Sequence, residues 1–177
     1  GCGPGRNLIF LADQGFEVYG VDISETALEM TRQKAAKLGL KVNLMKGDMT
    51  SLLFPDLFFD AVICVYVIYH GTLYSIKRTL LEIRRVLRPG GFVLVTFQTR
   101  RSHKYGSGKE IEPNTFVQQE PPELGIIHHF SDETEVRLLM EQFQILNVEL
   151  EELSTKNGNQ HSHWQVLARK SQTGRGL

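Results

Sequence analysis

The sequence predicts an α/β fold with a mostly parallel sheet and an antiparallel hairpin at the C-terminal end. Three observations predict it. Helical and strand patterns alternate over residues 6–97, one long apolar run is typical of a buried parallel strand, and two strand-like segments follow each other near the C-terminus. Alternation of this kind favours a parallel sheet with helices on both faces.

The first quarter of the chain alternates between helix and strand. Gly15 and Gly39 stand where helices commonly end, and Ser24 is a typical residue before a helix start. The patterns predict a helix, a strand, a second helix and a second strand over residues 6–14, 16–21, 25–38 and 42–45. We expect the buried face of the second helix to comprise Ala27, Met30, Ala35 and Leu38.

The middle of the chain carries the strongest signals. Residues 58–69 contain a nearly continuous apolar run, which predicts a strand buried on both faces. A helical period returns from Leu73 and continues to residue 88, where basic side chains suit a helix C-terminus. The break at residues 89–91 then predicts a strand over residues 92–97.

Residues 98–130 are polar, rich in glycine and proline and without sustained periodicity, so we expect a lid or substrate insert. Ser131 can cap a last helix whose apolar face continues to Phe143. Residues 145–153 and 163–169 predict the terminal antiparallel hairpin.

Composition limits the classes of function. The 177 residues fit a single domain, residues 1–177, and 20 basic residues balance 20 acidic ones. Zero net charge disfavours nucleic-acid and membrane partners. The two cysteines, Cys2 and Cys64, have no metal-ligand or redox spacing, which favours a reducing, cytoplasmic compartment, and no metal site is expected.

The chain opens on a glycine-rich turn, residues 1–5, and reaches Asp22 after the first predicted strand. Glycines let the backbone approach a ligand closely, and a carboxylate about twenty positions later can accept hydrogen bonds from a ribose diol. Together they predict a nucleoside-cofactor pocket. A dinucleotide-binding dehydrogenase is the nearest alternative, but its G-x-G-x-x-G pattern needs glycine where this chain has Arg6.

Several short motifs occur in an order that resembles class I S-adenosylmethionine-dependent methyltransferases of the small-molecule type. They are Gly1-Cys2-Gly3-Pro4-Gly5, Val21-Asp22, Gly47-Asp48-Met49, Phe59-Asp60-Ala61-Val62 and Val86-Leu87-Arg88-Pro89-Gly90-Gly91. The resemblance covers most of the chain and implies a Rossmann-like sheet, S-adenosyl-L-methionine as cofactor and methyl transfer to a small molecule. A non-catalytic cofactor-binding or regulatory module of the same fold is the alternative.

The resemblance also implies roles for individual residues. The glycines would line the methionine and ribose part of the cofactor, Asp22 would bind the ribose hydroxyls, and Asp48 would lie at the adenine edge. The implied cofactor-binding residues are Gly1, Gly3, Gly5, Asp22, Ile23, Asp48, Met49, Cys64 and Val65.

Candidate acceptor-binding residues follow the buried strand and end the insert: Tyr66, Tyr69, His70, His128 and His129. His70 is the candidate catalytic base, although methyl transfer often needs only alignment of the reacting atoms. Adjacent histidines on an extended segment point in opposite directions, which disfavours one metal site for both. The Asn/Asp-Pro-Pro-aromatic motif of enzymes that methylate nucleic-acid bases is absent, so small-molecule O, N or S acceptors remain.

In this fold, the first central strand precedes the glycine turn, where the sequence has no residues. Without that strand, the strands ending at Asp22 and near Cys64 would lie two strand spacings apart, about 9 to 10 Å. We therefore expect the chain to be N-terminally truncated and the natural protein to extend upstream. The acceptor, its reacting atom, the organism and the choice between monomer and homodimer are not determined by the sequence.

Overall fold

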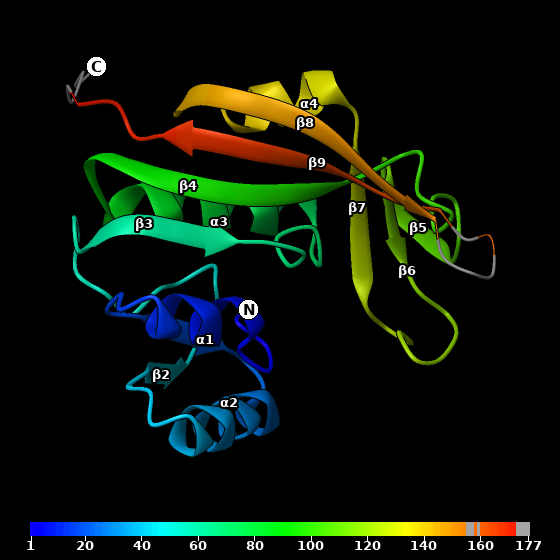
Figure 1. The fold of residues 1–177 in the computed structure, drawn as a ribbon. Helices are drawn as coiled ribbons and strands as arrows, with labels where there is room; N and C mark the ends of the chain where they lie inside the picture. The colour runs from blue at the N-terminus through cyan, green and yellow to red at the C-terminus, as the bar shows by residue number, and fades with distance from the viewer. Residues whose placement is uncertain (155–157, 159, 173–177) are drawn as a thin grey trace. The chain divides into compact units, whose positions relative to one another are not determined.

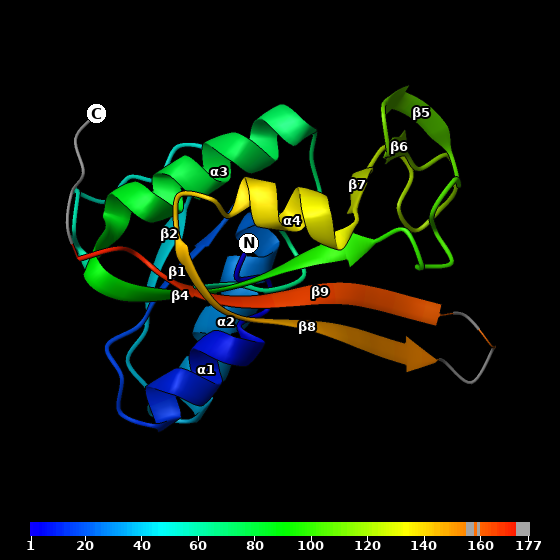
Figure 2. The same ribbon diagram turned by 90° about the horizontal axis from the view of Figure 1, so that it is seen from above.

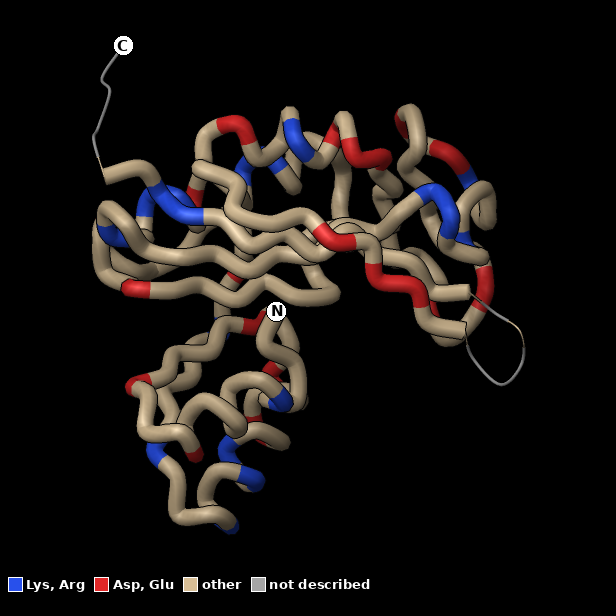
Figure 3. Tube along the Cα trace, turned by 45° about the horizontal axis from the view of Figure 1, so that its top comes forward, with Lys and Arg blue, Asp and Glu red and all other residues tan. Residues whose placement is uncertain are grey.

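The computed structural model describes residues 1–154, 158 and 160–172. The chain divides into two compact units, residues Gly1–Leu53 and Phe54–Leu177 (Figure 1). Among the described residues, no helix is both long enough and apolar enough to cross a membrane. Basic and acidic residues are interspersed along both units (Figure 3).

The first unit contains two helices and two strands in the predicted order. They are α1 (Arg6–Asp13), β1 (Tyr19–Asp22), α2 (Glu25–Lys37) and β2 (Asn43–Lys46). β1 and β2 pair in parallel, in register from Tyr19 with Asn43 to Asp22 with Lys46. The sequence prediction of these elements is confirmed, including the Ser24 cap, whose side chain accepts a hydrogen bond from the amide of Ala27.

The predicted buried face of α2 is confirmed at Ala35, is half-buried at Ala27, and is wrong at Met30 and Leu38. Leu28, Thr31 and Ala35 are buried, whereas Met30 and Leu38 are 47% and 62% exposed. Thr31 can be buried because its hydroxyl donates to backbone carbonyls, so apolar pattern alone does not identify this face.

The second unit is built on a seven-stranded sheet with helices on one face. Its elements, in chain order, are β3 (Phe59–Cys64), α3 (Leu73–Val86), β4 (Leu87–Thr99), β5 (Lys109–Glu112), β6 (Thr115–Val117), β7 (Ile127–Ser131), α4 (Glu133–Leu139), β8 (Gln144–Ser154) and β9 (Gln160–Arg169). The strand order is β5-β6-β7-β4-β9-β8, and β3 also pairs with β4. β3 and β7 are parallel to β4, whereas β9 is antiparallel to it.

The main hydrophobic core lies where α3 and α4 cover one face of this sheet (Figure 2). Every second residue of β4 faces it, including Val93, Val95 and Phe97. Ile76 and Leu80 of α3 are fully buried against these strands. The helical period recognised in the sequence therefore identifies the inner face of α3 correctly.

The prediction of a mostly parallel sheet and the prediction for β3 need correction. The sheet is mixed, because the insert and the terminal hairpin add antiparallel pairs. β3 ends at Cys64 rather than at Tyr69, since Tyr66 takes a left-handed backbone conformation with φ 58°. It is not buried on both faces: Ile63 is 42% exposed, and within the described residues β3 pairs with β4 alone.

The next strand begins before the predicted break at residues 89–91 and not after it. β4 begins at Leu87, directly after α3, and Leu87 pairs with Phe59 of β3. The cap of α4 also differs from the prediction. Asp132, not Ser131, accepts the hydrogen bond from the amide of Glu135.

The insert at residues 98–130 contains three short strands that the sequence did not reveal. β5, β6 and β7 form an antiparallel extension, visible at one end of the main sheet in Figure 1. These strands have three to five residues each, which is too short for an alternation of apolar and polar residues to be recognised in the sequence. The terminal hairpin of β8 and β9 is confirmed, and its turn lies partly outside the described residues.

Candidate functional site

The glycine turn of the first unit leads directly into α1. Gly3 and Gly5 both have left-handed backbones, with φ 53° and 79°, and Gly5 is the N-cap of α1. A Cβ on Gly5 would lie 2.5 Å from Cγ2 of Thr31, so packing against α2 requires glycine. A Cβ on Gly3 would meet no atom within 4 Å, which leaves space beside the turn. Gly1 is exposed.

Asp22 ties this turn to the end of β1. Its Oδ2 accepts a hydrogen bond from the amide of Gly3 at 2.7 Å, and its Oδ1 accepts one from the amide of Ser24 at 2.9 Å. Each carboxylate oxygen has a second acceptor position, so the group can also receive hydrogen bonds from a diol. The turn and this carboxylate therefore fit a ligand that combines a ribose with a chain lying close to the backbone.

The remaining predicted residues of the first unit lie after the same strand ends. Asp48 follows β2, and its Oδ1 accepts two hydrogen bonds from Thr50, from the amide and from the hydroxyl, each at 2.7 Å. These bonds lower the pKa of Asp48, so it is an ionised acceptor at neutral pH. Ile23 is 70% exposed beside Asp22, and Met49 is half-buried.

In the second unit, Cys64 is the last residue of β3, and Val65 and Tyr66 follow it directly. Burial raises the pKa of Cys64 to about 11, which makes this thiol a poor nucleophile. Val65 is half-buried. Tyr66 is fixed at two points: its amide donates to Oγ1 of Thr96 at 2.6 Å, and its phenol donates to Oε2 of Glu151 at 2.5 Å.

Five rings from three distant parts of the second unit pack together; we call them the aromatic cluster. They are Tyr66, Tyr69, His70, His128 and His163. Ring centroids lie 4.5 Å apart for Tyr69 and His70, 4.8 Å for His70 and His128, and 4.8 Å for Tyr66 and His163. Tyr69, His128 and His163 are buried, whereas His70 is exposed and Tyr66 is partly exposed.

The histidines of the aromatic cluster favour the neutral form. Burial lowers the pKa of His128 and of His163 to about 4, and partial burial lowers that of His70. Burial also raises the pKa of Tyr69. A proton-accepting ring is therefore present at neutral pH at each histidine of the cluster.

His128 connects the aromatic cluster to the insert. Its Nδ1 lies 2.8 Å from Oε1 of Gln98, and its Nε2 lies 3.3 Å from Oε2 of Glu123. Glu123 in turn forms an ion pair with Lys104. Burial is the largest single influence and works to raise the pKa of Glu123, but the hydrogen bond and charge of Lys104, together with smaller contributions from His128 and His70, outweigh it and lower the pKa.

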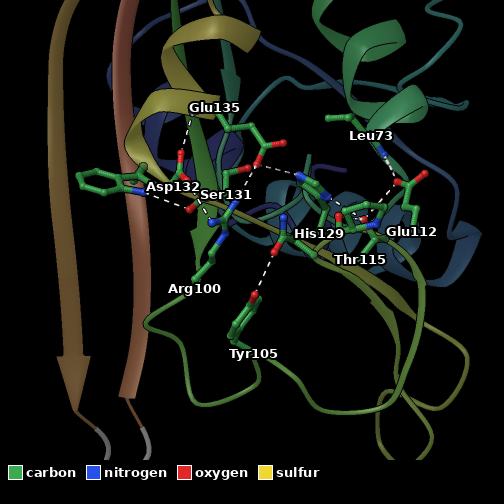
Figure 4. A network of polar contacts seen from close by, with 12 residues as sticks. Leu73, Arg100, Tyr105, Glu112, Thr115, His129, Ser131, Asp132 and Glu135 are labelled. Atoms are coloured by element: carbon green, nitrogen blue, oxygen red, sulfur yellow. Dashed lines mark hydrogen bonds and ion pairs between the residues drawn. The ribbon is translucent and has the colours of Figure 1, made fainter.

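His129 lies on the other side of β7 from His128, in a separate polar network (Figure 4). Its Nδ1 is 2.7 Å from the hydroxyl of Thr115, and its Nε2 is 3.3 Å from Oε2 of Glu135. The Thr115 hydroxyl also donates to Glu112, and Glu112 accepts a hydrogen bond from the amide of Leu73 at the start of α3. With both ring nitrogens facing protein groups and 1% exposure, His129 is better suited to joining the insert to α3 and α4 than to binding an acceptor.

The structure thus groups the predicted residues into two sets. Gly3, Gly5, Asp22 and Asp48 belong to the first unit, and Tyr66, Tyr69, His70 and His128 converge in the second. Sequence analysis missed His163, Glu151, Gln98 and Glu123. No local motif marks them, because each reaches the cluster through strand pairing or from the insert. Among the described residues, no group of three or more histidine, cysteine or acidic side chains could hold a metal ion.

Comparison with known proteins agrees with this geometry. A family profile described as a methyltransferase domain matches residues 1–91, more than half of the 177 residues. The chain is 32% identical over 145 residues to the putative methyltransferase YqeM of Bacillus subtilis, covering 73% of this chain and 56% of that protein. It is 25% identical over 175 residues to the sterol 4-C-methyltransferase strm-1 of Caenorhabditis elegans, covering 93% and 48%.

Solved structures extend the similarity over the whole fold. A SAM-dependent methyltransferase from Methanosarcina mazei superposes with a TM-score of 0.85 at 26% identity, covering 98% of this chain and 91% of that one. The 1,6-didemethyltoxoflavin-N1-methyltransferase of Burkholderia thailandensis, with a TM-score of 0.75 at 19% identity, shares the fold and covers 97% and 68%. The chain spans about half the length of the curated relatives it matches. The chain belongs to the class I S-adenosylmethionine-dependent methyltransferase family.

Proposed function

We propose that this chain transfers a methyl group from S-adenosylmethionine to a small-molecule acceptor. The observation that carries the proposal is the hydrogen bond from the Gly3 amide to Asp22, which holds the carboxylate proposed to bind the ribose against an open glycine turn. The similarity to a sterol methyltransferase supports a small acceptor. The even charge balance agrees with it, since it offers no broad attraction for nucleic acid.

In this proposal, the first unit supplies most of the cofactor contacts. Gly3 and Gly5 let the backbone approach the methionine and ribose part, Asp22 accepts from the ribose hydroxyls, and Asp48 accepts from the adenine edge. The cofactor supplies an electrophilic methyl group on a sulfonium. Further proposed contacts come from Gly1, Ile23, Met49, Cys64 and Val65.

Tyr66 and His70 are the proposed acceptor-facing residues, because they are the members of the aromatic cluster that are not buried. Their main contribution is orientation of the acceptor atom for in-line displacement. A neutral His70 can also take a proton from the acceptor. Tyr69 and His128 are buried, and their rings pack against the ring of His70.

The finer expectations about architecture remain proposals. We infer that residues 1–177 act as one methyltransferase domain and that residues 98–130 form the substrate insert.

Calorimetric titration with S-adenosylhomocysteine tests cofactor binding. Asp22→Asn keeps the size of the side chain but removes its charge, so the dissociation constant should rise about tenfold to a hundredfold, as expected for hydrogen bonds to a charged group. Asp13→Asn, at an exposed site at the end of α1, is the matched control and should leave it unchanged. An unchanged constant in Asp22→Asn would remove this carboxylate from the site.

Incubation of a metabolite extract with methyl-labelled S-adenosylmethionine tests catalysis. Transfer of label to a small molecule is the expected result, with a lower rate in Asp22→Asn when the cofactor is not saturating. Tight binding of S-adenosylhomocysteine without transfer would instead favour a non-catalytic module of the same fold.

A further inference from the structure

We propose that a doubly protonated His129 clamps the insert onto both ends of residues 69–73, the His70 segment, and is thereby a positioning residue for the acceptor site. The inference concerns the regulation of that site and rests on the proposed function for it. His129 lies outside the aromatic cluster, and its ring makes its contacts in the separate polar network of Figure 4.

The insert holds the His70 segment at both ends. At one end, the backbone amide of His129 in β7 donates a hydrogen bond to the carbonyl of Tyr69 at 2.9 Å. At the other end, Oε1 of Glu112 in β5 accepts a hydrogen bond from the amide of Leu73 at 2.6 Å. His70 lies between these two points, and its ring packs against Tyr69. The position of His70 therefore depends on how firmly β5 and β7 are held.

A chain of three contacts joins these strands to α4. Oγ1 of Thr115 in β6 lies 3.1 Å from Oε1 of Glu112 and 2.7 Å from Nδ1 of His129. The opposite ring nitrogen, Nε2, faces Oε2 of Glu135 in α4 at 3.3 Å. Both of these facing atoms are buried, and among the described residues neither forms a hydrogen bond to any other group. Such atoms are costly to bury without a proton between them.

The three contacts need three protons, and the network with a neutral ring has two. A neutral histidine carries one ring proton, the Thr115 hydroxyl carries one, and an ionised carboxylate carries none. With the ring proton on Nδ1, Nε2 presents a lone pair to Glu135. With it on Nε2, Thr115 must donate to the ring, and its contact with Glu112 has no proton. The carbonyl of Pro113, 3.4 Å from the hydroxyl, is a further acceptor. Only the doubly protonated ring completes all three contacts.

The charged groups that the structure places in this network favour that state. Glu112 approaches from β5 and Glu135 from α4, and the contact with His129 is the largest cause of the lowered pKa of Glu135. Arg100, which follows β4, lies 4.0 Å from Glu135 but pairs more closely with Asp132, at 3.1 Å. Histidine gains and loses its second ring proton near neutral pH, so the clamp should tighten below neutrality and loosen above it.

Hydrogen exchange of the Leu73 and His70 amides, followed by ¹⁵N NMR on the full chain, tests the clamp. Their protection factors, corrected for the intrinsic pH dependence of exchange, should fall at least about threefold from pH 6 to pH 8, as expected when one hydrogen bond is weakened. The Lys170 amide, which bonds the Gly91 carbonyl near the start of β4, is the internal control and should not change. The ring ¹⁵N signals of His129, assigned by their loss in His129→Gln, should move from the doubly to the singly protonated position over the same range.

Glu135→Gln separates the proton count from packing. The glutamine amide can donate to Nε2 of a neutral His129, so the contact no longer needs a second ring proton and the pH dependence at Leu73 should disappear. His103→Gln is the matched control, because His103 lies in the same insert, is exposed and contacts Gln160 instead; it should keep the wild-type pH dependence. Thermal melting confirms that each variant is folded.

Protection factors that do not change between pH 6 and pH 8 in the wild type would overturn the inference. So would a fall of equal size at the Lys170 amide, a pH dependence that persists in Glu135→Gln, or ring signals of His129 that do not move. Titration of the same samples with S-adenosylhomocysteine separates the two proposals. If this ligand binds while protection does not change with pH, the inference fails and the proposed function stands. If protection changes but this ligand does not bind, the proposed function fails and, with it, the acceptor-positioning role of the clamp.

Discussion

Replacing Gly5 with alanine tests whether close packing, and not only backbone flexibility, requires glycine in the turn. The new Cβ would lie 2.5 Å from Cγ2 and 2.7 Å from Oγ1 of Thr31, distances that real Cβ atoms essentially never show. Thr31 is fully buried in α2 and cannot swing into solvent. Its hydroxyl donates to the Gly3 carbonyl at 3.0 Å, so displacing Thr31 also loosens the turn.

The expected loss of free energy of unfolding in Gly5→Ala has two main parts. A left-handed backbone with a Cβ costs about 1 to 2 kcal/mol. Displacing Thr31 adds overpacking strain of about 1 to 3 kcal/mol, together with a weakened hydrogen bond. We therefore expect Gly5→Ala to lower the free energy of unfolding by roughly 2 to 5 kcal/mol, a large part of the 5 to 15 kcal/mol of a typical domain.

Urea unfolding followed by far-ultraviolet circular dichroism measures this loss. Gly39→Ala is the matched control, because Gly39 has φ 67° but a Cβ there would meet no atom within 4 Å. It should cost only the backbone part, about 1 to 2 kcal/mol. Adding Thr31→Ala to Gly5→Ala should recover part of the steric loss, giving a non-additive pair. Equal losses in the two glycine variants, with full additivity at Thr31, would refute the reasoning.

Two further predictions concern pH and helix capping. Because burial lowers the pKa of His128 and His163 from 6.5 to about 4, the folded state keeps them neutral. The contribution of the two neutral histidines to stability is therefore fully present above pH 6.5, and it should fall by roughly 1 to 3 kcal/mol per histidine as the pH drops towards 4. Urea unfolding of the wild type and of His163→Gln over this pH range measures the loss. An identical dependence of stability on pH in both proteins would contradict the prediction. Asp132→Ala should lower the melting temperature through loss of about 0.5 to 2 kcal/mol of capping. Ser131→Ala should leave it nearly unchanged, and the reverse order would restore Ser131 as the cap.

Local patterns predicted the elements whose signals are long or chemically specific. The period of Ile76, Leu80 and Ile83 identified both α3 and its buried face. The sequence assigned the glycine turn and Asp22 to one pocket, which stays a prediction, and the structure shows that the two are joined by a hydrogen bond from the Gly3 amide. The prediction for α3 succeeds because the interactions that determine it lie within one element.

The predictions fail where contacts with residues distant in the sequence determine the burial of a side chain or the end of a strand. Thr31 is buried because backbone carbonyls accept its proton, and β3 stops early because Tyr66 is fixed by Thr96 and Glu151. The strands of the insert are too short for a period, and pairing across them, not residue preference, creates them.

By itself, the sequence determined the α/β class, the cofactor family and the carboxylate proposed to bind the ribose. These follow from short motifs, in which residue type and spacing already imply backbone geometry. Only the tertiary structure brought Tyr66, His70, His128 and His163 together and placed Glu151 against the phenol. The physical reason is that side-chain contacts between distant segments depend on strand register and on the face each residue takes, and neither is encoded by any one segment alone.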